Sequence, residues 1–268
     1  MVKVAVGQFT PGTDKIENLA QIETLVGAAA AQGAEVLVLP EYSSFTAPVT
    51  DSRFVETAEP LDGTFVTAIS GLSARYKITV VAGLNEALSG DSDRMSNTLV
   101  ALDADGALAA TYRKLHLYDA FGNRESDVVR AGDIDTPETF VVAGFTFGLQ
   151  TCYDLRFPEV TRRIVDAGAD ALLLPAQWFP GPLKEDHWIT LLRARAIENT
   201  MYVAAAGQSA PTGSGQSVIV DPMGVILASA GEQVGTTASA VLSGERIQEV
   251  RSRNPALQLR RFTVATRC

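Results

Sequence analysis

The chain consists of two halves that repeat one order of predicted elements. The segment Gly33-Ala34-Glu35-Val36-Leu37-Val38-Leu39-Pro40 in the first half matches Gly168-Ala169-Asp170-Ala171-Leu172-Leu173-Leu174-Pro175 in the second. In both segments a helical pattern ends at Gly, an acidic residue follows, and an apolar strand stops at Pro. A repeat of this kind restricts the chain to a fold made of two similar parts.

The elements on either side of this motif correspond as well. The matched pairs are strands 4–9 and 145–151, helices 15–31 and 158–167, helices 64–76 and 184–199, strands 78–84 and 202–207, and hairpins 98–112 and 217–229. Asp, Pro and Gly set the turns of both hairpins. Each half is therefore predicted as β-α-β-α-β-β-β. The alternative is a chance repeat of the common β-α-β pattern.

Two such halves predict an α/β fold with four layers, an α-β-β-α sandwich in which helices cover the outer faces of two sheets. We expect residues 1–268 to form a single domain. The segment 238–268 has no counterpart in the first half and ends in a run rich in arginine. We expect it to be a C-terminal packing arm, which favours a homodimer or a higher homo-oligomer.

Charge and hydropathy exclude several classes of protein. The net charge is −9 and no basic cluster is present, which argues against a nucleic-acid partner. The longest apolar stretches are too short to span a bilayer, and the N-terminus reads as a strand rather than a signal peptide. The only cysteines are Cys152 and Cys268, so no disulfide framework is indicated and a cytoplasmic location is expected.

Three residues whose side chains are suited to catalysis each follow a predicted strand. Glu41 follows strand 36–39, Lys114 follows strand 108–112, and Cys152 follows strand 145–151. Ligands of open α/β sheets bind beyond the carboxyl ends of the strands, so all three lie where a site is expected. They supply an acid/base, a cation and a nucleophile, which acyl transfer through a thioester requires.

Each of these residues has a functional and a structural interpretation. Cys152 is either a nucleophile or an inert apolar side chain, Glu41 either a general base or a solvated loop residue, and Lys114 either a stabiliser of the oxyanion or an exposed lysine. The backbone N–H of Tyr153 is the natural second donor to the oxyanion. Glu125 is either loop charge or a residue that orients Lys114 or the substrate. We expect Cys268 to take no part in catalysis.

The expected substrate-binding residues come from nearby loops. They are Tyr42, Phe121, Gln177, Trp178, Phe179, Lys184 and His187. Lys184 and His187 are candidates to bind a substrate carboxylate. We expect Arg156 and Asp154 to pair with each other and so hold the turn after Cys152.

No cofactor or metal is predicted. The two histidines, His116 and His187, leave open a Cys–His pair, but their neighbours supply no pattern for it, and no ligand spacing suggests zinc. The turn Gly213-Ser214-Gly215 lacks the Gly-Lys-Ser/Thr of a phosphate loop.

The motifs around Glu41, Lys114 and Cys152 resemble those of the nitrilase, or carbon–nitrogen hydrolase, superfamily along nearly the whole chain. The resemblance implies a Glu-Lys-Cys triad at these positions, a second glutamate at Glu125, the four-layer sandwich, and homodimers. The stretches 115–121 and 152–159 are similar to deaminated glutathione amidases and omega-amidases, and 181–188 with 192–196 especially to bacterial deaminated glutathione amidases.

This resemblance implies a cysteine-dependent amidase that cleaves a small carboxylate-bearing amide, with deaminated glutathione as the leading substrate. An omega-amidase acting on 2-oxoglutaramate-type amides is the first alternative. A nitrilase proper, an acyltransferase that passes the thioester to an amine, and a non-catalytic scaffold are the others.

Overall fold

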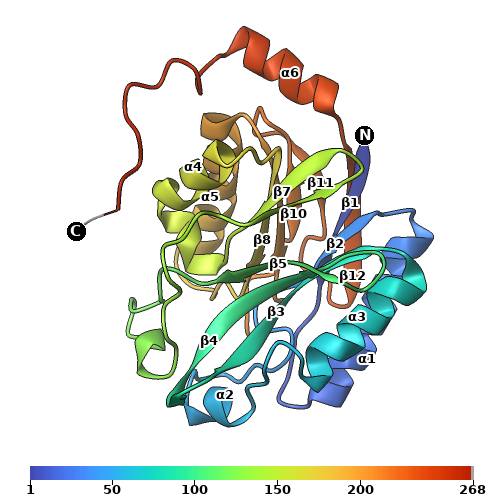
Figure 1. Cartoon of the computed structure of the whole chain (residues 1–268), viewed down its shortest axis with the longest axis vertical. Helices are drawn as coiled ribbons and strands as arrows, with labels where there is room; N and C mark the ends of the chain where they lie inside the picture. Colours follow the sequence, from blue (N-terminus) through green and yellow to red (C-terminus); the bar gives the residue numbers. More distant parts are fainter. Residues whose placement is uncertain (267–268) are drawn as a thin grey trace.

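Two six-stranded sheets form the centre of the structure, a computed structural model that describes residues 1–266 (Figure 1). The strands of the first sheet are β1 (Val2–Gln8), β2 (Val36–Val38), β3 (Thr79–Leu88), β4 (Asp91–Leu102), β5 (Leu108–Arg113) and β12 (Thr236–Leu242). Those of the second are β6 (Thr139–Val142), β7 (Phe145–Leu149), β8 (Ala171–Ala176), β9 (Tyr202–Gly207), β10 (Val218–Val220) and β11 (Ile226–Ser229). Cys268 lies outside the described residues.

The two sheets have the same topology. Their strand orders are β12-β1-β2-β3-β4-β5 and β6-β7-β8-β9-β10-β11. In each sheet the second, third and fourth strands of this order are parallel, and the flanking strands pair antiparallel. The repeat predicted from the sequence is therefore confirmed as a repeat of structure.

Helices cover the outer face of each sheet. The main helices are α1 (Lys15–Ala31) and α3 (Thr64–Tyr76) on the first sheet, and α4 (Pro158–Asp166) and α5 (Lys184–Asn199) on the second (Figure 1). The shorter elements are α2 (Ser52–Glu56), α6 (Gly244–Arg253) and the 3₁₀ turns η1 (Glu125–Asp127) and η2 (Cys152–Arg156). Helix α1 begins where the Asp14 carboxylate accepts from the N–H groups of Ile16 and Glu17.

Side chains alternate between two hydrophobic layers, as strand geometry requires. On β1, Val4 and Val6 pack between the sheets against residues such as Phe147 and Leu173, whereas Ala5 faces the helices of its own side. A third layer lies between the second sheet and its helices. These three apolar layers separate four layers of secondary structure, so the predicted α-β-β-α sandwich is confirmed.

The hairpin turns of the two halves use the same chemistry. In the turn after β4, the Asp103 carboxylate accepts from the N–H groups of Asp105 and Ala107, each at 2.9 Å. In the turn after β10, Asp221 accepts from Met223 and Val225 at 2.8 and 2.9 Å. An aspartate that satisfies two backbone donors fixes the turn locally, which explains why both hairpins were predictable.

The expectation that the segment from residue 238 onward lacks a counterpart was wrong for its first residues. Residues 238–242 lie in β12, which pairs antiparallel with β1 as β6 pairs with β7. Beyond β12, α6 buries Ile247 and Val250, and the chain then runs along the surface with Phe262 90% exposed (Figure 1). Among residues 1–266, no helix is both long and apolar enough to cross a membrane.

Candidate active site

Glu41 lies just beyond β2 with its side chain almost fully buried. One carboxylate oxygen accepts from Asn97 Nδ2 at 2.7 Å and from Lys114 Nζ at 3.0 Å. The other accepts from the backbone N–H of Gln177, at the end of β8, at 2.6 Å. Since Gln177 directly follows β8 of the second sheet, Glu41 bridges the two halves.

Strand β3 approaches Glu41 closely because residue 83 is glycine. A Cβ atom at Gly83 would lie 2.6 Å from the Tyr42 nitrogen and 2.8 Å from the Glu41 Cα. These are backbone atoms that cannot rotate aside, so any side chain at this position would displace Glu41. The position of the carboxylate is thus set by main-chain packing as well as by hydrogen bonds.

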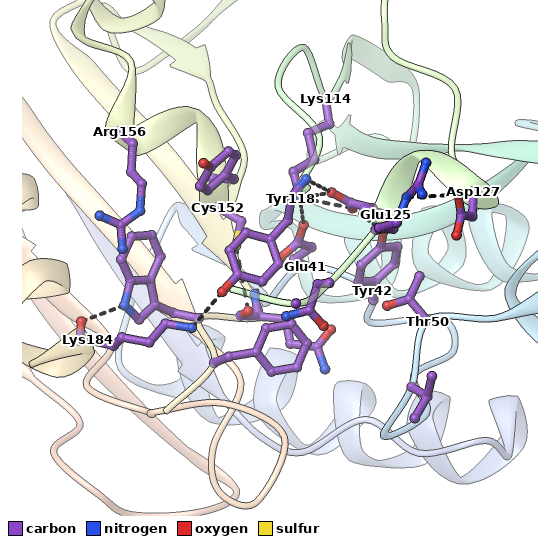
Figure 2. Close-up of a pocket in the computed structure, with 18 residues that line it drawn as sticks. Glu41, Tyr42, Thr50, Lys114, Tyr118, Glu125, Asp127, Cys152, Arg156 and Lys184 are labelled. Carbon is purple, nitrogen blue, oxygen red and sulfur yellow. Dashed lines mark hydrogen bonds and ion pairs between the residues drawn. The ribbon is translucent and has the colours of Figure 1, made fainter. Parts of the chain in front are cut away.

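Lys114 follows β5 and places its ammonium between two carboxylates (Figure 2). Its Nζ lies 3.0 Å from Glu41 and 2.9 and 3.0 Å from the two oxygens of Glu125. Burial disfavours the charged ammonium, but Glu125 and Glu41 outweigh it and raise the pKa of Lys114 well above its ordinary value. Lys114 is therefore a permanently charged cation with a fixed position.

Glu125 belongs to the 3₁₀ turn η1 and is held by donors from several elements. It accepts from the Tyr42 hydroxyl at 2.6 Å, from Asn97 at 3.1 Å, and from the backbone N–H of Tyr118 at 2.5 Å. Burial opposes its ionisation, yet Lys114 and then these donors lower the pKa of Glu125. Of the two functional interpretations from the sequence, this geometry favours the one in which Glu125 orients Lys114.

Cys152 begins the turn η2 with φ 42°, in the left-handed region, directly after β7 and Thr151. Its thiol is 7% exposed and donates to the Gln177 carbonyl at 3.6 Å. Burial, and next the Glu41 carboxylate, raise the pKa of this thiol well above its ordinary value, although Lys114 acts in the opposite sense. The resting cysteine is consequently a thiol, and its reaction as a nucleophile requires a base.

These groups line one cavity of about 270 Å³ (Figure 2). Of the predicted substrate-binding residues, five line it: Tyr42, Gln177, Trp178, Phe179 and Lys184. Tyr153 and Arg156 line it as well. Tyr153 directly follows Cys152 in the turn η2.

Two of the predicted binding residues are not in the cavity wall. His187 lies on α5, and its Nδ1 is buried. Phe121 is 67% exposed and instead packs its ring 4.9 Å from the Lys184 ammonium. His187 follows Lys184 by three residues in the first turn of α5, yet only Lys184 lines the cavity.

The predicted pair between Arg156 and Asp154 was wrong. The Asp154 carboxylate accepts from Tyr112 and His116, whereas the Arg156 guanidinium lies 4.8 Å from the centre of the Trp178 ring. Asp154 is fully buried, and Tyr112 and His116 rather than Arg156 are the partners that hold the turn. His116 is thereby committed to Asp154 rather than to Cys152, which argues against a Cys–His pair.

Two polar residues of the site were not predicted. Asn97 on β4 donates to both glutamates, and Tyr118 lines the cavity beside Lys184. Asn97 is flanked on β4 by the polar residues Ser96 and Thr98, so no local pattern in the sequence singled it out. The residues that the structure describes hold no group of three or more His, Cys, Asp or Glu side chains suited to a metal ion.

Comparisons with known proteins agree with this architecture. The sequence profile of the carbon–nitrogen hydrolase family matches residues 3–252. The chain is 40% identical to a deaminated glutathione amidase of Escherichia coli O157:H7 over 97% of each chain, and 32% identical to the omega-amidase NIT3 of Saccharomyces cerevisiae over 98% of this chain and 94% of that protein.

Solved structures of this superfamily have the same fold. The crystal structure of Saccharomyces cerevisiae Nit3, a member of the nitrilase superfamily, superposes with a TM-score of 0.86 at 31% identity, covering 97% of both chains. A mutant amidase of Nesterenkonia sp. AN1, carrying the acetamide moiety of fluoroacetamide on its active-site cysteine, gives 0.83 at 26% identity, covering 97% of this chain and 94% of that one. This chain therefore belongs to the carbon–nitrogen hydrolase family, within the nitrilase superfamily.

Proposed function

We propose that this protein is an amidase that hydrolyses a small carboxylate-bearing amide through a thioester acyl-enzyme, with deaminated glutathione as its main substrate. The observation that carries the proposal is the convergence of Glu41, Lys114 and Cys152 on one cavity whose opposite wall holds two further cations. The name of the Escherichia coli relative supports the choice of substrate.

The reaction begins when Cys152 Sγ attacks the amide carbonyl carbon and Glu41 takes the thiol proton. Lys114 and the N–H of Tyr153 stabilise the resulting oxyanion. Glu41 then passes its proton to the departing amine as the carbon–nitrogen bond breaks, which leaves a thioester on Cys152. Glu41 next deprotonates a water molecule, which attacks the thioester and releases the acid and the thiol. No cofactor takes part.

The raised pKa of Cys152 fits this order of events. A thiol that stays protonated at rest is protected from adventitious reaction and loses its proton only when the attack begins. The peptide of Gln177 supports the transfer because its N–H binds Glu41 and its carbonyl accepts from the thiol. Glu125 orients Lys114 and does not exchange protons, since Tyr42, Asn97 and Lys114 all hold its charged form.

The charge of the substrate is inferred from Arg156 and Lys184. The Lys184 ammonium donates to the Tyr118 hydroxyl at 2.7 Å (Figure 2). It also lies among the rings of Tyr118, Phe121 and Phe179. Among the described residues, aromatic faces rather than carboxylates contact both cations. Burial and, less strongly, Arg156 lower the pKa of Lys184. A substrate carboxylate would relieve the repulsion between them.

The test of this function is product release from deaminated glutathione and from 2-oxoglutaramate, measured side by side. A strong preference for deaminated glutathione supports the proposal, and a preference for 2-oxoglutaramate makes the protein an omega-amidase, as the yeast relative is named. Ammonia release from a nitrile but not from its amide would instead indicate a nitrilase. An acyltransferase would transfer the acyl group to an added amine faster than to water.

Replacing Lys184 with alanine should raise KM for the anionic amide about tenfold and leave KM for a neutral amide unchanged, because a charge-assisted hydrogen bond contributes about 1.5–3 kcal/mol. Steady-state kinetics on a matched pair of amides measures this. The Lys184→Arg variant keeps the charge and should retain most of the affinity. Equal effects of Lys184→Ala on the KM values of both amides would contradict a role of Lys184 in binding the carboxylate.

The protein is further proposed to act in the cytoplasm as a homodimer, because its chemistry needs a reduced thiol and its arm exposes apolar side chains such as Leu259 and Phe262. Light scattering of the full chain should give twice the 28.5 kDa of one chain. Deletion of residues 254–268 should shift the protein toward the monomer. A full chain that stays monomeric at every concentration would contradict the dimer.

A further inference from the structure

The turn that carries Cys152 needs support from its surroundings. This segment, η2 (Cys152–Arg156), is here called the nucleophile turn. Cys152 adopts φ 42°, a conformation that costs a residue other than glycine of order 1 kcal/mol and persists only where the rest of the structure imposes it. The groups that hold this turn therefore also determine where the thiol points.

Asp154 provides the main anchor of the nucleophile turn. Its carboxylate is 0% exposed and accepts from the Tyr112 hydroxyl at 2.7 Å, from the backbone N–H of His116 at 2.8 Å, and from His116 Nδ1 at 2.7 Å. Burial and then the Asp154 charge raise the pKa of Tyr112, so its phenol remains a donor. A buried carboxylate with three donors of this kind is strongly bound.

The donors to Asp154 flank the lysine of the site. Tyr112 lies two residues before Lys114 and His116 two residues after it. The same short segment thus carries the ammonium that contacts Glu41 and the groups that bind the nucleophile turn. Asp154 is separated from Cys152 by a single residue, Tyr153, which lines the cavity and carries the N–H proposed to bind the oxyanion. One carboxylate therefore fixes the spacing between the thiol, this N–H and the ammonium.

Two further contacts hold the arrangement. The His116 ring is stacked on Phe157 at 3.7 Å with an angle of 6° between the planes, which fixes the direction of Nδ1. On the opposite side of the turn, the buried guanidinium of Arg195 donates to the Leu155 carbonyl through Nε at 3.1 Å and through a terminal nitrogen at 2.7 Å. The turn is thus tied to β5 at one side and to α5 at the other.

We propose that Asp154 is a positioning residue that, through Tyr112 and His116, locks the nucleophile turn against the Lys114 segment and so aligns Cys152 with the oxyanion donors. This role of Asp154 in catalysis rests on the proposed function, because the aligned groups are those that attack an amide. Asp154 does not contact the substrate. Its loss should therefore lower the rate of acylation and leave substrate binding to the cavity wall almost unaffected.

The test compares Asp154→Asn with the wild-type protein, both shown to be folded by circular dichroism at the assay temperature. Asparagine keeps the size of the side chain but turns an amide donor toward one of the three donors. We expect kcat to fall about 100-fold, as a displacement of reacting groups by about 1 Å can cause, with KM changed less than threefold. A kcat within twofold of wild type would overturn the proposal.

A second readout does not depend on the natural substrate. Fluoroacetamide is a weak electrophile that reacts only when held in line with the thiol, whereas a methanethiosulfonate reacts with any accessible thiol. Mass spectrometry of the Cys152 peptide gives both rates. Asp154→Asn should slow the first about 100-fold and leave the second within a few-fold. An equal change in both rates would mean a role in folding or access alone, which contradicts positioning.

His116 supplies variants for the case in which Asp154→Asn does not fold, because its side chain is 36% exposed. The Nδ2 of asparagine occupies about the place of histidine Nδ1, so His116→Asn should keep most of kcat, whereas His116→Leu should lose much of it. Equal kcat values for the two would overturn the proposal. If the wild type hydrolyses no amide tested, the proposed substrate fails, but the ratio of the two labelling rates still decides the role of Asp154.

Discussion

Replacing Cys152 with alanine is expected to abolish amide hydrolysis, with a loss of kcat on the order of 10⁴-fold or more, because no other group near Lys114 can form the acyl-enzyme. The fold should be retained, since alanine is smaller than cysteine and the site is only one part of a large apolar layer. Product release measured over hours against a buffer blank, together with a thermal melt, tests both statements.

Two matched variants sharpen this prediction. Cys152→Ser keeps a hydroxyl of similar size, but serine is a far weaker nucleophile without a base adapted to it, so it should be nearly as inactive. Cys268→Ala removes the only other cysteine and should leave turnover unchanged. Hydrolysis by Cys152→Ala within tenfold of the wild type would refute the thioester mechanism, and a non-catalytic scaffold would be refuted by robust turnover in the wild type.

Replacing Glu41 with glutamine should lower kcat about 10³-fold, the effect expected when a general base is lost. The glutamine amide cannot accept and return the protons that Glu41 transfers during acylation and deacylation. The change is isosteric, and Asn97, Lys114 and the Gln177 N–H remain as neighbours. Quenched-flow sampling with intact-protein mass spectrometry separates the two steps. Both acylation and deacylation should be slow, and acyl-enzyme formation at the wild-type rate would show that Glu41 is not the base.

The same variant should change the pH dependence of thiol labelling in a defined direction. After burial, the negative charge of Glu41 is the next cause of the raised pKa of Cys152, while Lys114 lowers it. Removing that charge leaves only the weaker effect of Glu125 to oppose that of Lys114, so the pKa of Cys152 should fall and labelling should begin at lower pH than in the wild type. A shift of the labelling profile to higher pH would contradict the electrostatic description of the site.

Sequence patterns predicted most of the fold because its repeated elements carry local signals. Helices α1, α3 and α5 begin and end at the residues expected; Asp14 caps the start of α1 and Gly63 precedes α3. The strands β6 and β12 were missed because neither follows an Asp-containing hairpin turn of the kind that marked the edge strands β5 and β11. Most residues of β12 are only partly buried, and its pairing with β1 joins residues more than two hundred positions apart, which no local pattern reveals.

The residues of the site show the same difference between local patterns and long-range contacts. Glu41, Lys114 and Cys152 were predicted because each follows a recognisable apolar strand. The contacts of Asn97, Tyr118 and Arg156 arise only when distant elements pack together, and chemical type alone gave the wrong partner for Asp154. His187 lies three residues after Lys184 on α5 but is not among the residues that line the cavity, so helical spacing alone did not identify the residues of the wall.

The bridge between Glu41 and Gln177 ties catalysis to the contact between the sheets. Glu41 comes from one half of the repeat and Cys152 from the other, and their registry depends on side-chain packing between the sheets, through residues such as Val6, Phe147 and Leu173, as well as on hydrogen bonds such as that of Glu41. A small sliding of one sheet over the other would part base from nucleophile without breaking any strand pairing. The rate of turnover should therefore depend on the relative position of the two sheets. Substitutions in the apolar layer between them can change kcat although none of these residues contacts the substrate.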